Sequence, residues 1–375
     1  MERVYLDWNA RAPLLGNAQR AMTEAMNTLQ GNPSSQHREG QHARSAVEDA
    51  RIKVAGLLNA RSRDIIFTSG ATESLHLAIH GALQRTPSRR KILTFATEHH
   101  AVLDEVSALK EQGWNAHILP VDANGEPLMN PFMDSLDDTC AVVSVMLANN
   151  ETGVCYNIGP MVEAARKAGA FMVVDAAQVP GRVPLDVAAL QADAVALSAC
   201  KFGGPPGVGA LWVRQGAAWS PPRHGGNQEM GRRPGTENII GVVGMGAAAA
   251  AVDLTQMEKM RALRDAFEER LHAMAPDTVI HGALGQRLPN TTFAAFPGVD
   301  VQMLLVLLDQ AGVAASSGSA CVSGAFKPSH VLQAMGVNKS HIRSSVRFSL
   351  GFSTTAAEMA RAAEVLEDCL PRARL

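Results

Sequence analysis

The chain of 375 residues is poor in charge, in aromatic rings and in lysine. Charged residues make up 19%, aromatic residues 5%, and the formal net charge at pH 7 is -2. Because apolar residues reach 46%, a disordered chain is excluded, since disorder requires low hydrophobicity and high net charge. The missing basic excess argues against a nucleic-acid partner. The length predicts two or three domains at roughly 150 residues each.

Long apolar segments and closely paired cysteines are also missing. The longest uncharged apolar stretch, residues 238–252, is shorter than the roughly 20 residues that a membrane helix needs. The first residues are charged and lack the apolar region of a secretory signal. The five cysteines include no C-x-x-C pair, so we expect neither a disulfide framework nor a metal site. These absences predict a soluble, cytoplasmic protein without a membrane partner.

Short apolar segments alternate with helical patterns through the first two thirds of the chain. Strands that are apolar along their whole length, with helices between them, are typical of a parallel sheet covered on both faces. We therefore predict an α/β fold with a mostly parallel seven-stranded sheet, whose ligands bind at the carboxyl ends of the strands. The predicted strands are residues 65–68, 91–95, 117–121, 141–147, 171–175, 194–197 and 209–213.

The composition changes after about residue 235. An alanine-rich segment leads to a long helical pattern, after which two short strands and two more helices are predicted. This arrangement predicts a smaller α+β domain beside the large one. We place the large domain at residues 16–250 and the small domain at residues 1–15 together with 251–375.

Lys201 is the most informative of the eight lysines. Four of the others fall in helical patterns, where a solvated side chain is the ordinary interpretation. Lys201 instead follows the apolar segment 194–200, where an ammonium group loses water unless it is paired or its charge is removed. Bond formation with the aldehyde of pyridoxal phosphate (PLP) removes the charge. Position alone leaves a buried ion pair as the alternative.

Two further features fit a PLP site. Asp175 ends the predicted strand 171–175, and PLP needs an acidic partner at its pyridine nitrogen. The turn Ser69–Gly70–Ala71–Thr72 joins a strand to a helix, where main-chain N–H groups favour a phosphate. Each has an ordinary alternative, a helix cap for the aspartate and a common strand-to-helix turn for the phosphate site.

Cys321 differs from the other cysteines in its surroundings. It lies in the segment 316–324, which is rich in glycine and serine and too polar to belong to a core. A thiol in such a loop is a candidate nucleophile, and a tolerated surface thiol is the alternative.

With these residues assembled, the chain closely resembles cysteine desulfurases of the NifS/IscS type, in the class V aminotransferase group of fold-type I PLP enzymes. The resemblance runs nearly from end to end. The matching segments are residues 5–7, 31–35, 67–73, 97–103, 149–153, 175–178, 231–238, 316–321 and 344–351.

The resemblance implies a role for each matching position. Lys201 is expected to bond to PLP and to move protons, and Cys321 to accept sulfur from L-cysteine as a persulfide while L-alanine is released. Arg347 is expected to bind the substrate carboxylate. The remaining roles are stacking and acid–base work by His99, the ring-nitrogen contact of Asp175, the ring-oxygen contacts of Gln178 and Asn150, substrate contact by Asn150, and phosphate contacts of Ala71, Thr72, Ser198 and, across a homodimer, Thr236.

Three positions depart from the family's usual pattern. Cys200 stands where the family has a histidine before the lysine, and a thiol is a weaker donor to phosphate than an imidazole. Pro206 replaces a lysine in the following turn, and Arg11 replaces a threonine near the N-terminus. Every group that the chemistry needs is still present.

These residues predict a cysteine desulfurase that passes sulfur to an acceptor protein for iron–sulfur clusters or other sulfur-containing products. One alternative is a selenocysteine lyase, a cysteine sulfinate desulfinase or a related carbon–sulfur lyase, in which Cys321 is dispensable. Another is a non-catalytic sulfur-relay scaffold that has kept only the fold.

Overall fold

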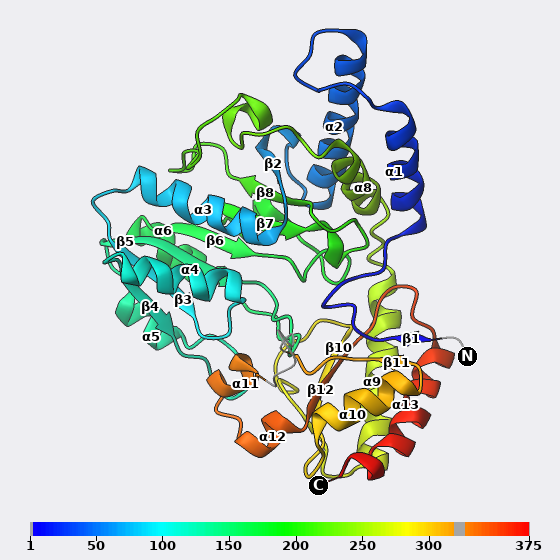
Figure 1. The fold of residues 1–375 in the computed structure, drawn as a ribbon. Coiled ribbons are helices and arrows are strands. Elements are labelled where there is room, and N and C mark those ends of the chain that lie inside the picture. Colours follow the sequence, from blue (N-terminus) through cyan, green and yellow to red (C-terminus); the bar gives the residue numbers. More distant parts are fainter. Residues whose placement is uncertain (1–2, 319–326, 375) are drawn as a thin grey trace.

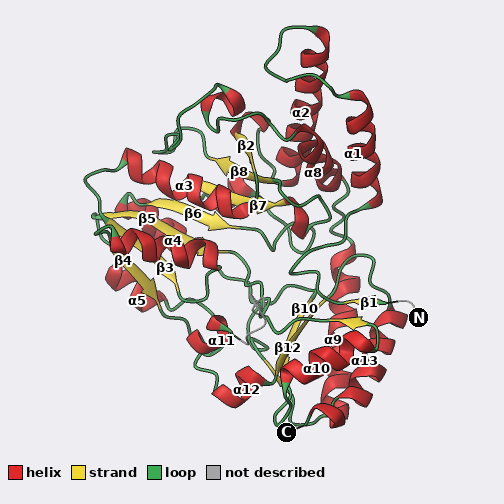
Figure 2. Ribbon diagram, in the orientation of Figure 1, coloured by secondary structure: helices red, strands yellow, loops and turns green. Residues whose placement is uncertain are grey.

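A seven-stranded sheet with helices on both faces forms the larger part of the molecule (Figures 1 and 2). The computed structural model describes residues 3–318 and 327–374. The strand order is β2-β8-β7-β6-β5-β3-β4, and β8 runs antiparallel to both neighbours in an otherwise parallel sheet. This confirms the predicted α/β fold. The strands are β2 (Ile65–Thr68), β3 (Lys91–Phe95), β4 (Asn115–Leu119), β5 (Cys140–Met146), β6 (Phe171–Asp175), β7 (Ala194–Ser198) and β8 (Gly209–Val213).

The helices of this larger part cover the sheet. α3 (Ala71–Arg85) and α4 (His100–Glu111) pack on one face, and α2 (Arg38–Leu57), α6 (Gly159–Ala168) and α8 (Ile239–Ala250) contribute to the core on the other. The further elements are α1 (Gly16–Thr28), α5 (Met129–Ser135), α7 (Val187–Leu190) and the short 3₁₀ turns η1 (Ser62–Asp64), η2 (Ala199–Lys201) and η3 (Gln228–Gly231). Within residues 3–318 and 327–374, no helix combines the length and the apolar character needed to cross a membrane.

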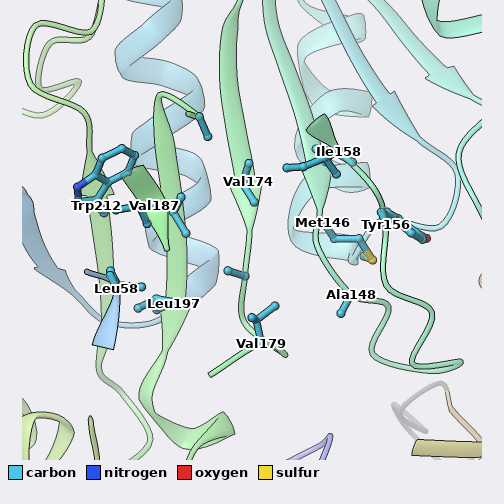
Figure 3. Close-up of a cluster of buried hydrophobic side chains, with 14 of the residues drawn as sticks. Leu58, Met146, Ala148, Tyr156, Ile158, Val174, Val179, Val187, Leu197 and Trp212 are labelled. Atoms are coloured by element: carbon cyan, nitrogen blue, oxygen red, sulfur yellow. The ribbon is translucent and has the colours of Figure 1, made fainter. Parts of the chain in front are cut away.

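The pleat of the strands divides the core into two layers. Along β6, Phe171 and Val173 face one buried cluster, and Met172 and Val174 face the other. Figure 3 shows the second cluster, to which β6 contributes Val174 and the neighbouring strand β7 contributes Leu197. Full burial of one such side chain contributes roughly 1.5–3 kcal/mol, so both faces help to hold the strand ends in place.

A smaller sheet lies beside the large one, with α9, α10 and α13 gathered around it (Figure 1). Its strands run in the order β12-β10-β9, and the two-residue strands β1 and β11 pair separately. The division into residues 16–250 and 1–15 with 251–375 stays a prediction. The elements are β1 (Val4–Tyr5), α9 (Gln256–Met274), β9 (Val279–Ile280), β10 (Thr291–Ala295), α10 (Val301–Gln310), β11 (Val313–Ala314), α11 (His330–Ala334), α12 (Lys339–Arg343), β12 (Ser345–Ser349), α13 (Ala356–Cys369) and η4 (Pro371–Ala373).

The segment after β1, residues 6–15, crosses from the small sheet to the large one, and we call it the N-terminal arm. Its main chain donates from Ala12 to the Cys200 carbonyl at 2.8 Å and from Leu15 to the Gly203 carbonyl at 2.9 Å. Gly203 has a φ of 87°, and a Cβ there would lie 2.5 Å from the Leu15 side chain. The arm is therefore fixed against the turn that carries Lys201.

A buried ion pair fixes the strand that leads into the turn 69–72. Glu229 binds the Arg51 guanidinium through both oxygens at 2.6 and 2.8 Å, and also accepts from the Phe67 N–H at 2.8 Å. Both side chains are almost fully buried. Removal of one partner from such a pair leaves an uncompensated charge in the core.

We expect Glu229→Gln to lower the free energy of unfolding by roughly 3 kcal/mol, because the Arg51 charge then lacks its buried counter-ion. Glu48→Gln is the matched control, since Glu48 pairs with the same guanidinium from a half-exposed position. That change should cost less than about 1 kcal/mol. Urea unfolding measures both, and equal losses in the two variants would contradict this assignment.

Candidate active site

The carboxyl ends of β2, β6 and β7 bring the predicted residues to one edge of the large sheet. Asp175 ends β6 and pairs in register with Ala196 of β7, and η2 then places Lys201 directly after β7. The turn 69–72 follows β2, which is parallel to β7 because β8 runs antiparallel to both. The predicted convergence of these strand ends is what the topology produces.

The half-buried Lys201 side chain is held by neutral acceptors. Nζ donates to the main-chain carbonyls of Asn9 at 2.9 Å and Ala10 at 2.7 Å. In the described part of the chain Lys201 forms no ion pair with a carboxylate, so the structure favours a desolvated amine over the buried ion pair. Burial lowers the pKa of Lys201, and the neighbouring cations of Arg182 and Arg347 lower it further. A lysine with a lowered pKa is available as a neutral nucleophile.

Asp175 and His99 complete an electrostatically linked group with Lys201. The Asp175 carboxyl is 7% exposed, and one oxygen accepts from the Ala177 N–H at 2.8 Å. Burial raises the pKa of Asp175, while the Ala177 hydrogen bond and the charges of His99 and Lys201 oppose the rise. These mutual effects place the three side chains near one another, as the sequence predicted.

The exposed ring of His99 caps the start of α4. Nδ1 of this ring accepts from the Ala101 N–H at 3.1 Å, so the proton of the neutral ring lies on Nε2. Desolvation lowers the pKa of His99, and the nearby Asp175 carboxylate partly offsets this effect. A neutral imidazole whose remaining N–H faces away from the helix can exchange protons with a ligand.

The turn before α3 is suited to an anion. The helix begins at Ala71 after Gly70, which provides no side-chain cap, and the exposed Thr72 adds a hydroxyl to the first turn. A Cβ on Gly209 would lie 2.6 Å from the Gly70 main chain, so only glycine permits this close packing of β8 beneath the turn. At the end of β7, the Ser198 hydroxyl lies 3.4 Å from the Cys200 thiol.

Arg347 of β12 lies where the small sheet meets the N-terminal arm. It is 3% exposed and donates to the Asn150 carbonyl at 2.9 Å and to the Asp7 carboxylate at 2.6 Å. Its Nε is buried and has no hydrogen-bond partner among residues 3–318 and 327–374. A buried guanidinium donor without a partner is suited to bind the carboxylate of a ligand.

Three further predicted residues are Gln178, Thr236 and Cys321. Gln178 is buried, and its side-chain amide donates to the Asn9 carbonyl at 3.0 Å, so it shares this acceptor with Lys201. Thr236 is exposed in the segment after Arg233, which binds Glu73 in the first turn of α3. Cys321 lies outside the described residues.

Sequence reasoning missed the residues that organise the site from a distance. The arm supplies the carbonyls that hold Lys201, and Asp7 orients Arg347. Arg182 binds the Lys201 carbonyl and the Gln178 side chain. Residues 178–182 form turns and no helix, so their spacing of four residues is not a sequence signal for this contact.

Comparisons with known proteins show which family the chain resembles. The model of the family described as aminotransferase class-V matches residues 4–361. A cysteine desulfurase of Cereibacter sphaeroides is 43% identical over all of this chain and 97% of that protein. A solved NifS-like protein shares 31% identity with a TM-score of 0.91, over 99% of this chain and 100% of that one. The structure titled SspA in complex with cysteine has 28% identity and a TM-score of 0.83, over 94% and 99%.

The family match covers nearly the whole chain, and the similarity to the curated relative spans all of it. The chain therefore belongs to the class V aminotransferase family, a family of PLP-dependent enzymes.

Proposed function

We propose that the protein is a PLP-dependent cysteine desulfurase that transfers sulfur from L-cysteine to Cys321 and releases L-alanine. The observation that carries the proposal is the Lys201 amine, which is desolvated and held by neutral carbonyls beside the buried Asp175. The relative named cysteine desulfurase, at 43% identity over the whole chain, supports the choice of reaction. The similar structure titled as a cysteine complex supports the choice of substrate.

The described residues fit the chemical groups of PLP. The Lys201 amine suits its aldehyde, the buried Asp175 carboxyl suits its ring nitrogen, and the uncapped start of α3 suits its phosphate. Ser198 and Cys200 are proposed to assist at the phosphate, and Gln178 with Asn150 at the ring oxygen. When bound, PLP supplies an aldehyde that bonds to amines and a ring that withdraws electrons from the substrate's Cα.

The chain's own residues bind and orient the substrate. The unpartnered Nε of Arg347 is proposed to take the substrate carboxylate, while Asp7 and the Asn150 carbonyl keep the guanidinium in place. Because the side chain is almost fully buried, a hydrogen bond made there is not diluted by water. The carboxylate contact therefore fixes which end of the amino acid faces Lys201.

Two side chains are placed to move protons. Lys201, once its nitrogen is released, can take a proton as a neutral amine because burial lowers its pKa. His99 carries its exchangeable proton at Nε2, since Nδ1 is occupied by the Ala101 N–H. We assign proton transfer at the substrate Cα to Lys201. We assign proton exchange at the cofactor ring to His99.

Cys321 is the proposed sulfur acceptor. Its thiolate attacks the substrate sulfur, the carbon–sulfur bond breaks, and the carbon gains a proton. The products are L-alanine and a persulfide on Cys321, so no external oxidant or reductant is needed. An acceptor protein then receives the outer sulfur. A homodimer in which Thr236 reaches the partner's phosphate site and a cytoplasmic location belong to the same proposal.

The test is an assay of the PLP-loaded protein with L-cysteine, in which alanine and sulfide are measured for the wild type and for Cys321→Ala. We expect the wild type to release alanine. The variant should release it more than about 100-fold more slowly, because removal of a nucleophile typically has an effect of this size. Cys155→Ala is the matched control, because its thiol lies outside this group and burial raises its pKa to about 11.

Other results of this assay distinguish the alternatives. Full release of alanine from L-cysteine by Cys321→Ala contradicts the persulfide route. Turnover of selenocysteine or cysteine sulfinate by a protein that is inert toward L-cysteine supports the other lyases. Absence of bound PLP and of turnover with all three substrates supports a non-catalytic scaffold.

We expect Arg347→Lys to raise KM for L-cysteine by roughly 10- to 100-fold with a smaller change in kcat, because a charged hydrogen bond contributes about 1.5–3 kcal/mol. The lysine keeps the charge opposite Asp7 but loses the second donor for the substrate. Steady-state kinetics measure the effect, with Arg343→Lys on the exposed surface as control. An unchanged KM would remove Arg347 from the substrate site.

A further inference from the structure

Arg182 is a buried cation whose contacts among the described residues are all with neutral groups. Its side chain belongs to a residue that is 4% exposed, and it forms no ion pair within residues 3–318 and 327–374. The guanidinium instead donates to neutral oxygens. These are the Gln178 carbonyl at 2.8 Å, the Gln178 side-chain oxygen, the Trp8 carbonyl at 3.3 Å and the Lys201 carbonyl at 3.2 Å.

This arrangement lowers the stability of the fold. A buried charge that only neutral dipoles stabilise costs more than an apolar side chain of similar size. Burial lowers the pKa of Arg182 to about 9, and the Arg347 cation contributes to the shift. A costly charge of this kind, placed against a group of ionisable residues, is typical of a functional site.

The contact with Gln178 determines which way its amide faces. A guanidinium has only donors, so the Gln178 oxygen must point at Arg182 and its NH₂ group must point away. The NH₂ group accordingly donates to the Asn9 carbonyl at 3.0 Å, the same carbonyl that accepts from Lys201 Nζ at 2.9 Å. Arg182 therefore directs the donor end of Gln178 toward the proposed cofactor site.

The contact with Lys201 acts in two ways. Arg182 holds the Lys201 main chain through its carbonyl, and at the same time it brings a positive charge close to the amine. After burial, the groups that act on this amine are Cys200 and Asp175, which favour its protonated form, and Arg182 and Arg347, which disfavour it. The charge of Lys201 in turn lowers the pKa of His99.

We infer that Arg182 is a positioning residue that fixes the Gln178 amide and the Lys201 main chain and places a positive charge close enough to act on the Lys201 amine. The inference rests on the proposed function, since it concerns the same site. It adds to that site a residue that touches neither substrate nor cofactor and acts through the two side chains that it holds.

The experiment compares Arg182→Gln, which keeps polar contacts but removes the charge, with Arg182→Lys, which keeps the charge. In each PLP-loaded protein, the visible absorbance is titrated against pH to follow protonation of the nitrogen contributed by Lys201. Loss of a neighbouring positive charge favours the protonated form, so the midpoint should rise by about 1 pH unit in Arg182→Gln. It should stay near the wild-type value in Arg182→Lys, and Arg20→Gln on the exposed face of α1 is the control.

An unchanged midpoint in a folded, PLP-binding Arg182→Gln protein would overturn the inference, and Arg182→Met replaces this variant if it fails to fold. A wild type that binds no PLP would overturn the proposed function instead. In that case the rate of Lys201 acetylation in the cofactor-free chain, measured by mass spectrometry across a pH series, tests the inference independently of PLP. We expect the pH at which this rate is half its maximum to rise in Arg182→Gln. An unchanged pH profile would contradict the role of Arg182.

Discussion

The two hydrogen bonds that hold the Lys201 amine against main-chain carbonyls are the interaction on which the rest of the site depends. An ammonium group at the end of a buried strand loses hydration, and here the described residues provide it with two main-chain carbonyls and no carboxylate. The nearest fixed charges include the cations of Arg182 and Arg347, which lower its pKa further. The position therefore shifts the amine toward its neutral, reactive form.

The hydrogen bonds of the Lys201 amine explain why distant parts of the chain meet at this point. The two carbonyls belong to the N-terminal arm, which reaches across from the small sheet and is fixed by hydrogen bonds to the turn after β7. The same arm carries Asp7, which orients Arg347 of β12. The lysine, the ring-facing residues and the proposed carboxylate-binding arginine are thus linked through one segment of about ten residues.

Sequence patterns predicted the central sheet well, since its strands are apolar on both faces. They placed β4 at residues 117–121, whereas the structure has Asn115–Leu119, because this edge strand takes its register from pairing with Lys91–Phe95 rather than from burial. Lys201 and Asp175 could be predicted because each ends an apolar segment. The roles of Asn9, Asp7 and Arg182 could not, since they depend on long-range contacts that no local pattern records.

The substitution of Cys200 for the family's usual histidine has no full physical explanation in the structure. Its thiol contacts the Ser198 hydroxyl at 3.4 Å, close to the proposed phosphate site, and Cys200 raises the pKa of Lys201. The pKa of Lys201 is therefore affected by Cys200, which departs from the family's pattern, as well as by Asp175, Arg182 and Arg347.

The central claim is that Lys201, of all eight lysines, forms the bond to the cofactor. Borohydride reduction of the PLP-loaded protein makes this bond permanent, and peptide mapping by mass spectrometry then locates the label. The account predicts one pyridoxyl group per chain, on the peptide that contains Lys201. A label on another lysine, or no label at all, would contradict it.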